Sequence, residues 1–419
     1  MSFLQFIEQI IFFPLARYPL VGIVVSLVIF FFLAKAVLAS RAYFLAYTAT
    51  LNKKWVTLEI RIPREIERSP VAMEVFIINA LYHSSTGSFW SKHWKGFIKN
   101  AVSLELVSFG GSLHFYIYCQ AWLKDVIESQ LYVQFPQVEI IEVEDYTDRI
   151  PPYRSDADWD LYGVSFKQRL SPAYPIKTYR DWGVDKHYES LEVTQQIDPL
   201  SSLIEAMSSL RPGEEWWIQI MVQANTGGDW KNIAQKEISN LKQAYSEQTA
   251  KSEEGRSAST FTDGEKETIY AIERSSDKHR FDVGIRTIYI ARKDAFNDAR
   301  TKLIRNTYAS FASNQLNTLE RIEYTGFDNP WEDYNSFLDN KKKERFLEDY
   351  RRREYFNIRD RFTLFDFYMK YIDPHDYHTM VLNSEELATI YHLPGRVIQT
   401  PGIERLESRK AEPPSNLPT

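Results

Sequence analysis

The chain has 419 residues, of which 44% are hydrophobic and 15% aromatic, and its formal net charge is -6. This length and apolar content predict a folded protein with two or more domains and exclude a wholly disordered chain. The charge balance gives no overall basic field for nucleic acid, so any such binding would need a local patch. Cys119 is the single cysteine, which excludes an intrachain disulfide and a multi-cysteine metal site.

The N-terminal region carries a long apolar run. Residues 18–33 read YPLVGIVVSLVIFFFL without a charge, and AVLA after Lys35 extends the run to about 20 residues, the length that crosses a hydrocarbon core. We predict a transmembrane helix over 18–40, preceded by an interfacial apolar segment over 1–17. A cleaved signal peptide is the alternative, but no basic region opens the chain.

The charges that flank this run predict its orientation. Basic residues are denser after the run than before it, and such residues mark the cytoplasmic side of a membrane helix. We therefore expect a single-pass protein of the cytoplasmic (inner) membrane with its main body in the cytoplasm. The residues compared are Lys35, Arg41, Lys53 and Lys54 after the run and Arg17 before it.

Residues 41–150 show alternating strand and helix patterns. The run WVTLEIRI alternates like a half-buried strand, and Ser69-Pro70 then begins a helix. Two strand patterns flank Gly110-Gly111, a typical hairpin turn, and an amphipathic helix and the strand VEIIEVEDY follow. The order is βαββαβ, which predicts a ferredoxin-like domain.

Residues 151–327 repeat this pattern with an insertion. Without the insertion the order is βαβ followed by βαβ, which predicts a second ferredoxin-like domain in tandem. The inserted part contains two helix patterns, joined by a polar stretch near 248–262 that we predict to be a mobile loop. The expected fold class is therefore α+β, with two tandem ferredoxin-like domains behind a transmembrane helix.

Two further segments follow these domains. Residues 328–380 predict a charged helical arm, and 381–419 an extended, proline-rich strap in which residues 385–388 form a short helix-like anchor. The arm holds the densest basic cluster of the chain, which is a possible nucleic-acid contact or simply a solvated helix face. This cluster consists of Lys341, Lys342, Lys343, Arg351, Arg352 and Arg353.

Motifs for chemistry are scarce in this sequence. It contains no G-x-x-x-x-G-K-[ST] phosphate loop, no H-E-x-x-H and no G-x-S-x-G. We therefore expect no catalytic residues, no cofactor and no enzymatic activity. His375 and His378 of DPHDYH are weak metal candidates, since two histidines without further ligands do not define a site, and a polar turn explains them as well.

Several blocks carry a family resemblance. They include LEIRIPREIERSPVAMEVFIINALYH, LELVSFGGSLHFYI, DPLSSLIEAMSSLRPGEEWWIQIMV and the terminal LNSEELATIYHLPG. Together they resemble an uncharacterised family of membrane-anchored proteins from candidate-phyla-radiation bacteria (Patescibacteria). Members of that family are encoded beside, or fused to, P-loop ATPases similar to type IV secretion coupling proteins and HerA-like translocases. The resemblance implies that this chain lacks the ATPase domain, which would begin where the strap ends.

The resemblance implies a non-enzymatic membrane scaffold that docks such an ATPase through the strap, with a second copy of the chain as a further candidate partner. The alternatives are a membrane-tethered nucleic-acid-binding accessory protein of the same machinery, a metal-dependent enzyme, or a strap that packs back on its own domain. The expected docking residues are Glu385, Glu386, Leu387, Tyr391, His392, Leu393, Pro394 and Gly395.

Overall fold

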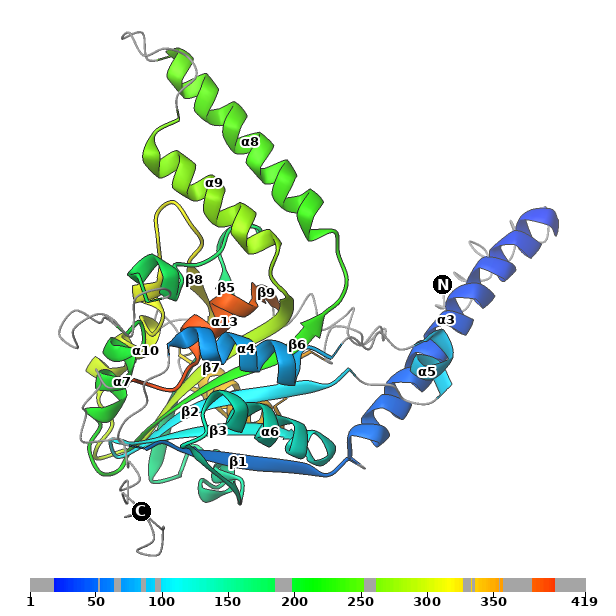
Figure 1. Ribbon diagram of the computed structural model, residues 1–419. Helices are drawn as coiled ribbons and strands as arrows, with labels where there is room; N and C mark the ends of the chain where they lie inside the picture. The colour runs from blue at the N-terminus through cyan, green and yellow to red at the C-terminus, as the bar shows by residue number, and fades with distance from the viewer. Residues whose placement is uncertain are drawn as a thin grey trace, which may run out of the picture. The chain divides into compact units, whose positions relative to one another are not determined.

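The computed structural model describes most of the chain and divides it into two compact units (Figure 1). Unit 1 comprises Met1–Lys53, Gly87–Lys99 and Asn357–Asp376, and unit 2 comprises the remainder. The residues described are 19–51, 53–63, 69–83, 88–94, 99–184, 198–251, 261–326, 333, 336–353, 355–356 and 379–395.

Unit 1 contains two described helices, α3 (Pro19–Leu51) and α5 (Phe89–Trp94). They are in contact, because the Arg41 guanidinium lies 5.4 Å from the ring centroid of Trp94. Within the part of the chain that the structure describes, no helix has both the length and the apolar character that crossing a membrane requires. The transmembrane helix predicted over 18–40 is therefore unsupported, and the interfacial segment predicted over 1–17 lies outside the described residues.

The first half of unit 2 follows the predicted order βαββαβ. Each crossover skips one strand, so that β3 lies between β1 and β2 and β1 lies between β3 and β4, as a split βαβ pattern requires. All neighbouring strands are antiparallel. The elements are β1 (Trp55–Arg61), α4 (Pro70–Leu81), β2 (Ala101–Phe109), β3 (Ser112–Gln120), α6 (Lys124–Gln134) and β4 (Glu139–Val143).

The second half repeats this connectivity, with strand order β6-β7-β5-β8. The two inserted helices stand between β6 and β7, and the first of them continues to Lys251, into the segment predicted to be a loop. Residues 252–260 of that segment lie outside the described residues. The elements are β5 (Trp159–Gln168), α7 (Ser201–Ser208), β6 (Glu214–Asn225), α8 (Trp230–Lys251), α9 (Asp263–Ser276), β7 (Arg280–Arg292), α10 (Asp298–Arg305) and β8 (Leu319–Tyr324).

The two halves share one sheet. Strand β2 pairs with β6 in antiparallel register from Ala101 opposite Gln223 to Phe109 opposite Glu215. The path along the sheet is therefore β4-β1-β3-β2-β6-β7-β5-β8, and β9 pairs with β7 beside it. A mixed chain with a large antiparallel sheet and helices confirms the coarse α+β expectation.

The strands bury both faces of the sheet. Ile218 and Ile220 of β6 face a large apolar core that also includes Phe76 of α4 and Ile127 of α6. Trp217, the residue before Ile218, faces the opposite side and a second core, formed with helix α11 (Phe337–Arg352). Figure 1 shows α4, α6 and α13 over the first face. Because both faces are covered, the strands are more buried than the half-buried pattern predicted.

Helix α11 and the C-terminal segment correct two predictions. The charged arm is packed on the sheet, since Phe346, Leu347 and Tyr350 of α11 are buried. The strap predicted over 381–419 begins with strand β9 (Met380–Asn383), and helix α13 (Ser384–Ile390) then forms a longer helix than the anchor expected at 385–388. Residues 357–378 and 396–419 lie outside the described part of the chain.

Short 3-10 helices complete the described elements. They are η2 (Ala121–Leu123), η3 (Tyr146–Arg149), η4 (Tyr179–Trp182) and η6 (Ala309–Phe311).

Candidate functional site

The predicted docking residues lie inside unit 2. Strand β9 continues along the side of β7 where pairing with β5 ends, with Asn383 opposite Arg280. Helix α13 follows at once and packs against α4, and all seven of its residues are buried. The segment after it remains buried through Gly395.

Local sequence explains why α13 begins where it does. The Asn383 side chain accepts a hydrogen bond from the backbone N–H of Glu386 at 2.9 Å, and Glu386 Oε2 accepts one from the Asn383 N–H at 2.8 Å. This reciprocal capping box satisfies two donors that a helix N-terminus leaves free. Glu386 Oε1 also accepts the Ile176 N–H at 2.9 Å, which fixes the helix to the body.

Two buried carboxylates, Glu74 and Glu385, share a basic side chain beside α13. Lys278 Nζ lies 2.6 Å from Glu74 and 3.5 Å from Glu385. Glu385 also accepts a hydrogen bond from Thr178 Oγ1 at 2.7 Å and lies 3.2 Å from Arg274 Nη2. We call these five residues the α13 clasp.

The carboxylates at α13 differ in pKa. Burial alone would raise the pKa of Glu74, but hydrogen bonds from Lys278, Tyr179 and Ser384 lower it overall. Burial raises the pKa of Glu386 to about 7, against the lowering effect of its backbone hydrogen bonds and of Arg280. Glu386 therefore titrates near neutral pH, whereas Glu74 stays ionised there.

The remaining docking candidates are also held inside unit 2. His392 Nε2 lies 3.1 Å from Asp198 Oδ1, and its Nδ1 lies 2.8 Å from the Ala388 carbonyl oxygen. The Tyr391 hydroxyl donates to the Tyr116 carbonyl oxygen at 3.2 Å. Residues 385–395 are buried in this structure, as the packed-back alternative expects, and docking of a partner through them stays a prediction.

Sequence reasoning did not identify the partners of these residues. Glu74, Thr178 and the pair Arg274 and Lys278 come from three separate segments, and no motif joins them. The capping pattern Asn383-x-x-Glu386 is a local signal that could have placed the start of this helix.

The predicted basic cluster on α11 is largely engaged within the molecule. Lys343 Nζ lies 2.7 Å from Asp160 and 3.0 Å from Asp339, and Arg352 lies 2.7 Å from Glu348. The other four members also interact within the molecule. Arg351 donates to the Thr147 carbonyl oxygen, and Lys341 lies over the Phe337 ring. Arg353 is buried, and Lys342 is not free of partners. The six residues therefore do not form one exposed basic patch, which corrects the nucleic-acid expectation for Lys343 and Arg353.

Arg353 pairs with Glu105 at the junction between the two halves of the sheet. Its Nε donates to Glu105 on β2 at 2.9 Å, its Nη1 bonds Asp145, and its guanidinium lies 3.9 Å from the centroid of Tyr118. Glu105 also accepts a hydrogen bond from Gln219 on β6 at 3.1 Å. Burial would lower the pKa of Arg353, but Glu105 and Asp145 raise it. The buried cation is therefore compensated at the β2–β6 pairing, and we call this group the seam cluster.

The metal hypothesis concerns residues that are not described. His375 and His378 lie outside the described ranges. Within those ranges, no group of three or more potential metal ligands gathers.

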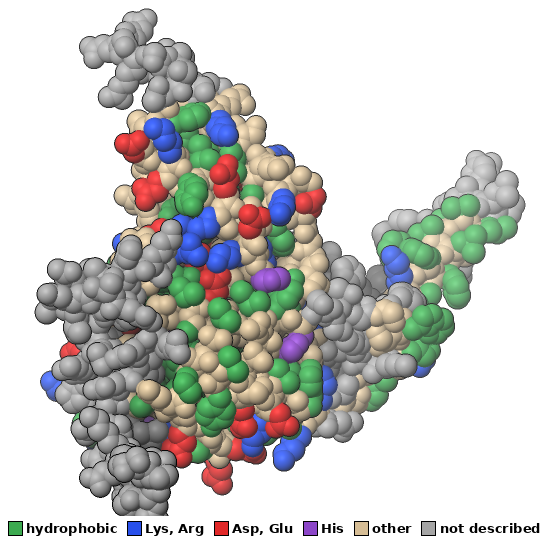
Figure 2. All heavy atoms as spheres, in the orientation of Figure 1, with side chains coloured by type: hydrophobic (Ala, Val, Ile, Leu, Met, Phe, Trp, Pro, Cys, Tyr) green, Lys and Arg blue, Asp and Glu red, His purple; other side chains and the backbone are tan. Residues whose placement is uncertain are grey.

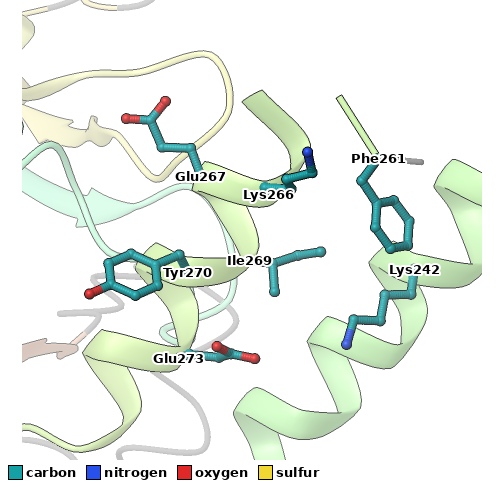
Figure 3. A pocket seen from close by; sticks show the side chains of 7 residues that line it. All are labelled: Lys242, Phe261, Lys266, Glu267, Ile269, Tyr270 and Glu273. Atoms are coloured by element: carbon teal, nitrogen blue, oxygen red, sulfur yellow. The ribbon is translucent and has the colours of Figure 1, made fainter. Parts of the chain in front are cut away.

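A shallow groove of about 540 Å³ lies between the side chains of α8 and α9 (Figure 3). Ile269, Tyr270 and Phe261 give it an apolar wall, and charged residues of both signs surround them. Lys242 belongs to α8, and Lys266, Glu267 and Glu273 belong to α9. This mixture of apolar and oppositely charged side chains does not indicate one class of ligand.

Helix α3 presents apolar side chains to solvent. Ten large hydrophobic residues between Ile23 and Leu33 are exposed, from 37% at Val25 to 70% at Phe30. Figure 2 shows hydrophobic side chains along this helix. Because the exposed residues are consecutive apart from Ser26, they occupy all sides of the helix rather than one stripe.

Comparison with known proteins places the chain in a family. Residues 43–405 match the model described as "Domain of unknown function (DUF8128)". The chain belongs to this family. The DUF8128 match includes the whole sheet, α11 and α13, and it begins after the exposed apolar run of α3. No curated protein matches the chain.

Proposed function

We propose that this DUF8128 protein is a non-enzymatic scaffold that attaches to the cytoplasmic membrane through α3 and docks a P-loop ATPase of the type IV secretion or HerA-like kind. The observation that carries the membrane part is the exposed apolar surface of α3 between Ile23 and Leu33. Removing one large apolar side chain from water is favourable by roughly 1.5–3 kcal/mol, so ten such side chains provide a strong drive toward an apolar phase.

The distribution of these side chains favours lipid over a protein groove. A groove covers one side of a helix, whereas α3 is apolar on all sides, as is typical of helices surrounded by hydrocarbon or by a protein core. From Ile23 to Leu33 the helix rises about 15 Å, at 1.5 Å per residue. That length is about half of a hydrocarbon core of roughly 30 Å, so the described run reaches the depth of one leaflet.

The charges beyond the run support the proposed orientation. Lys35 and Arg41 follow it and are exposed. Basic residues next to a membrane helix favour the cytoplasmic side. The proposal therefore keeps unit 2 in the cytoplasm.

The ATPase part of the proposal is supported by the family resemblance and is revised by the burial of α13. Because residues 385–395 are buried, we propose that the docking element follows Gly395, in a segment whose sequence contains Pro401, Pro413, Pro414 and Pro418. The α13 clasp would then hold the helix that precedes that segment in the chain. Proline fixes φ and so lowers the entropy lost when an extended segment binds.

Affinity purification from detergent-solubilised native membranes tests this proposal. The full chain is compared with a truncation after Gly395, which retains every described residue of α13. We expect a P-loop ATPase to copurify with the full chain and to be lost from the truncation, while both proteins remain in the membrane fraction.

Two results would contradict the proposal. Recovery of the full chain in the soluble fraction of native cells would exclude membrane attachment. Equal recovery of the ATPase with both proteins would exclude the C-terminal docking segment, and nucleic acid in place of an ATPase would favour the accessory-protein alternative.

A further inference from the structure

We propose that Trp90 and Trp94 of α5, together with Arg41 of α3, form a contact site for the headgroup layer of an anionic phospholipid membrane. This inference rests on the proposed membrane attachment. It adds the lipid class and the side chains that recognise it.

The three side chains form one cluster within unit 1. The indole rings of Trp90 and Trp94 have their centroids 4.7 Å apart, and the Arg41 guanidinium lies 5.4 Å from the Trp94 ring. Trp90 is 65% exposed and Trp94 is 40% exposed, whereas Trp216 in the sheet is 1% exposed. Two adjacent exposed indoles beside an exposed cation are unusual for a surface that contacts only water.

The position of this cluster along α3 matches a membrane interface. Val37, which is 68% exposed, is followed by Arg41 four residues later, or about 6 Å along the helix axis. The headgroup layer on each side of a bilayer is about 5–8 Å thick. If the apolar run enters hydrocarbon as far as Val37, Arg41 and the Trp94 ring in contact with it therefore reach the level of the headgroups.

The chemistry of the cluster fits that layer. Tryptophan is enriched at membrane interfaces because its ring is apolar and its N–H is a hydrogen-bond donor. A guanidinium binds phosphate oxygens through paired hydrogen bonds, and it keeps its charge at any physiological pH. Lys35 adds a second exposed cation nearby in the sequence, so a negatively charged surface is favoured over a neutral one.

Vesicle flotation of the full chain tests the inference. Vesicles of phosphatidylcholine alone are compared with vesicles that also contain phosphatidylserine. We expect the wild type to bind the anionic vesicles more tightly. We expect Arg41→Gln to reduce that preference by about fivefold, the factor for one basic residue near an anionic surface.

The tryptophans are tested with a matched control. The double substitution Trp90→Ser and Trp94→Ser should lower binding to both vesicle types at least several-fold, since two interfacial aromatic side chains are lost. Trp122→Ser removes an indole of unit 2 that is 58% exposed, and it should leave binding unchanged. The double substitution to phenylalanine should retain part of the binding, which shows that a loss seen with serine does not reflect misfolding.

The outcomes separate this inference from the proposed function. If the full chain binds neither vesicle type, both the membrane attachment and the inference fail. If it binds but the serine variants and Arg41→Gln bind like the wild type, the attachment stands and the headgroup site is overturned. Equal affinity of the wild type for neutral and anionic vesicles would overturn the choice of anionic lipid.

Discussion

The two halves of the sheet share one connectivity and differ in the link between their second and third strands along the chain. In the first half, β2 and β3 are joined by Gly110-Gly111, both with positive φ. In the second half, the equivalent strands β6 and β7 are joined through α8 and α9. The same strand order therefore tolerates either a two-residue turn or a long helical hairpin.

The difference has a physical reason on each side. A Cβ atom on Gly111 would lie 2.7 Å from the Ser208 carbonyl oxygen at the end of α7, so the short turn is confined by the other half. The long link, in contrast, brings Arg274 of α9 and the following Lys278 to the carboxylates of the α13 clasp. The comparison teaches that the end of the insertion contributes charged partners to the C-terminal helix, while the two halves join through the β2–β6 pairing beside the seam cluster.

A substitution in the seam cluster should give the largest loss in the free energy of unfolding. Arg353→Ala would leave Glu105 buried without its cation, and breaking a buried pair in this way costs about 3–5 kcal/mol. We expect that loss in the free energy of unfolding, measured by urea denaturation with tryptophan fluorescence. Arg352→Ala, whose partner Glu348 is exposed, is the control and should change stability by less than about 1 kcal/mol. A similar small change for Arg353→Ala would show that the seam does not depend on this ion.

A substitution in the α13 clasp should give the next largest loss in the free energy of unfolding. Glu385→Ala removes the acceptor of Thr178 and the partner of Arg274, and we expect a loss of about 2–3 kcal/mol, the range for hydrogen bonds to charged groups. Exchange of the α13 amide protons should quicken more than exchange in β1. Glu267→Ala on the exposed side of α9 is the control. A double-mutant cycle with Arg274→Ala measures whether the insertion itself contributes, and zero coupling would disprove its role.

The packing of the second face predicts a smaller effect. A Cβ atom on Gly284 of β7 would lie 2.2 Å from the Tyr355 ring, so Gly284→Ala should cost about 1–3 kcal/mol through overpacking. Gly227→Ala, where the nearest atom is 3.9 Å away, is the control. In a Tyr355→Ala background the Gly284→Ala cost should vanish. If it persists, the cost does not come from this contact.

Titration of Glu386 should change how the free energy of unfolding depends on pH, rather than shift the stability by a large amount. Its pKa is about 7 in the folded protein, above the ordinary value of 4.5, so the folded state binds more protons between these values. The free energy of unfolding should therefore fall as pH rises from about 4.5 to about 7. Glu386→Gln should remove this contribution, measured as the difference between wild-type and variant unfolding curves across that window.

The pKa values of Glu74 and Asp145 are lowered, so their contributions are lost at lower pH, as it falls below the unfolded values. Glu74 and Asp145 therefore do not explain a fall in the free energy of unfolding between about pH 4.5 and about pH 7. Identical pH profiles for the wild type and Glu386→Gln would contradict the assignment.

The sequence by itself determined the local elements of this protein. Strand alternation, the Ser69-Pro70 helix start, the glycine turn and the helix patterns of the insertion all predicted elements that form. These signals are local because they depend on side-chain periodicity and on backbone preferences of a few neighbouring residues. The repeated βαββαβ order followed from them.

Only the tertiary structure decided how these elements combine. Pairing of β2 with β6 makes one sheet of two predicted domains, and α11 covers a face that the alternation pattern assigned to solvent. The C-terminal prolines suggested a strap, but Asn383, Glu385 and Glu386 find partners more than a hundred residues away in sequence, such as Ile176, Thr178 and Ser275. Such contacts depend on the free energy of long-range burial and charge pairing, which no local pattern records.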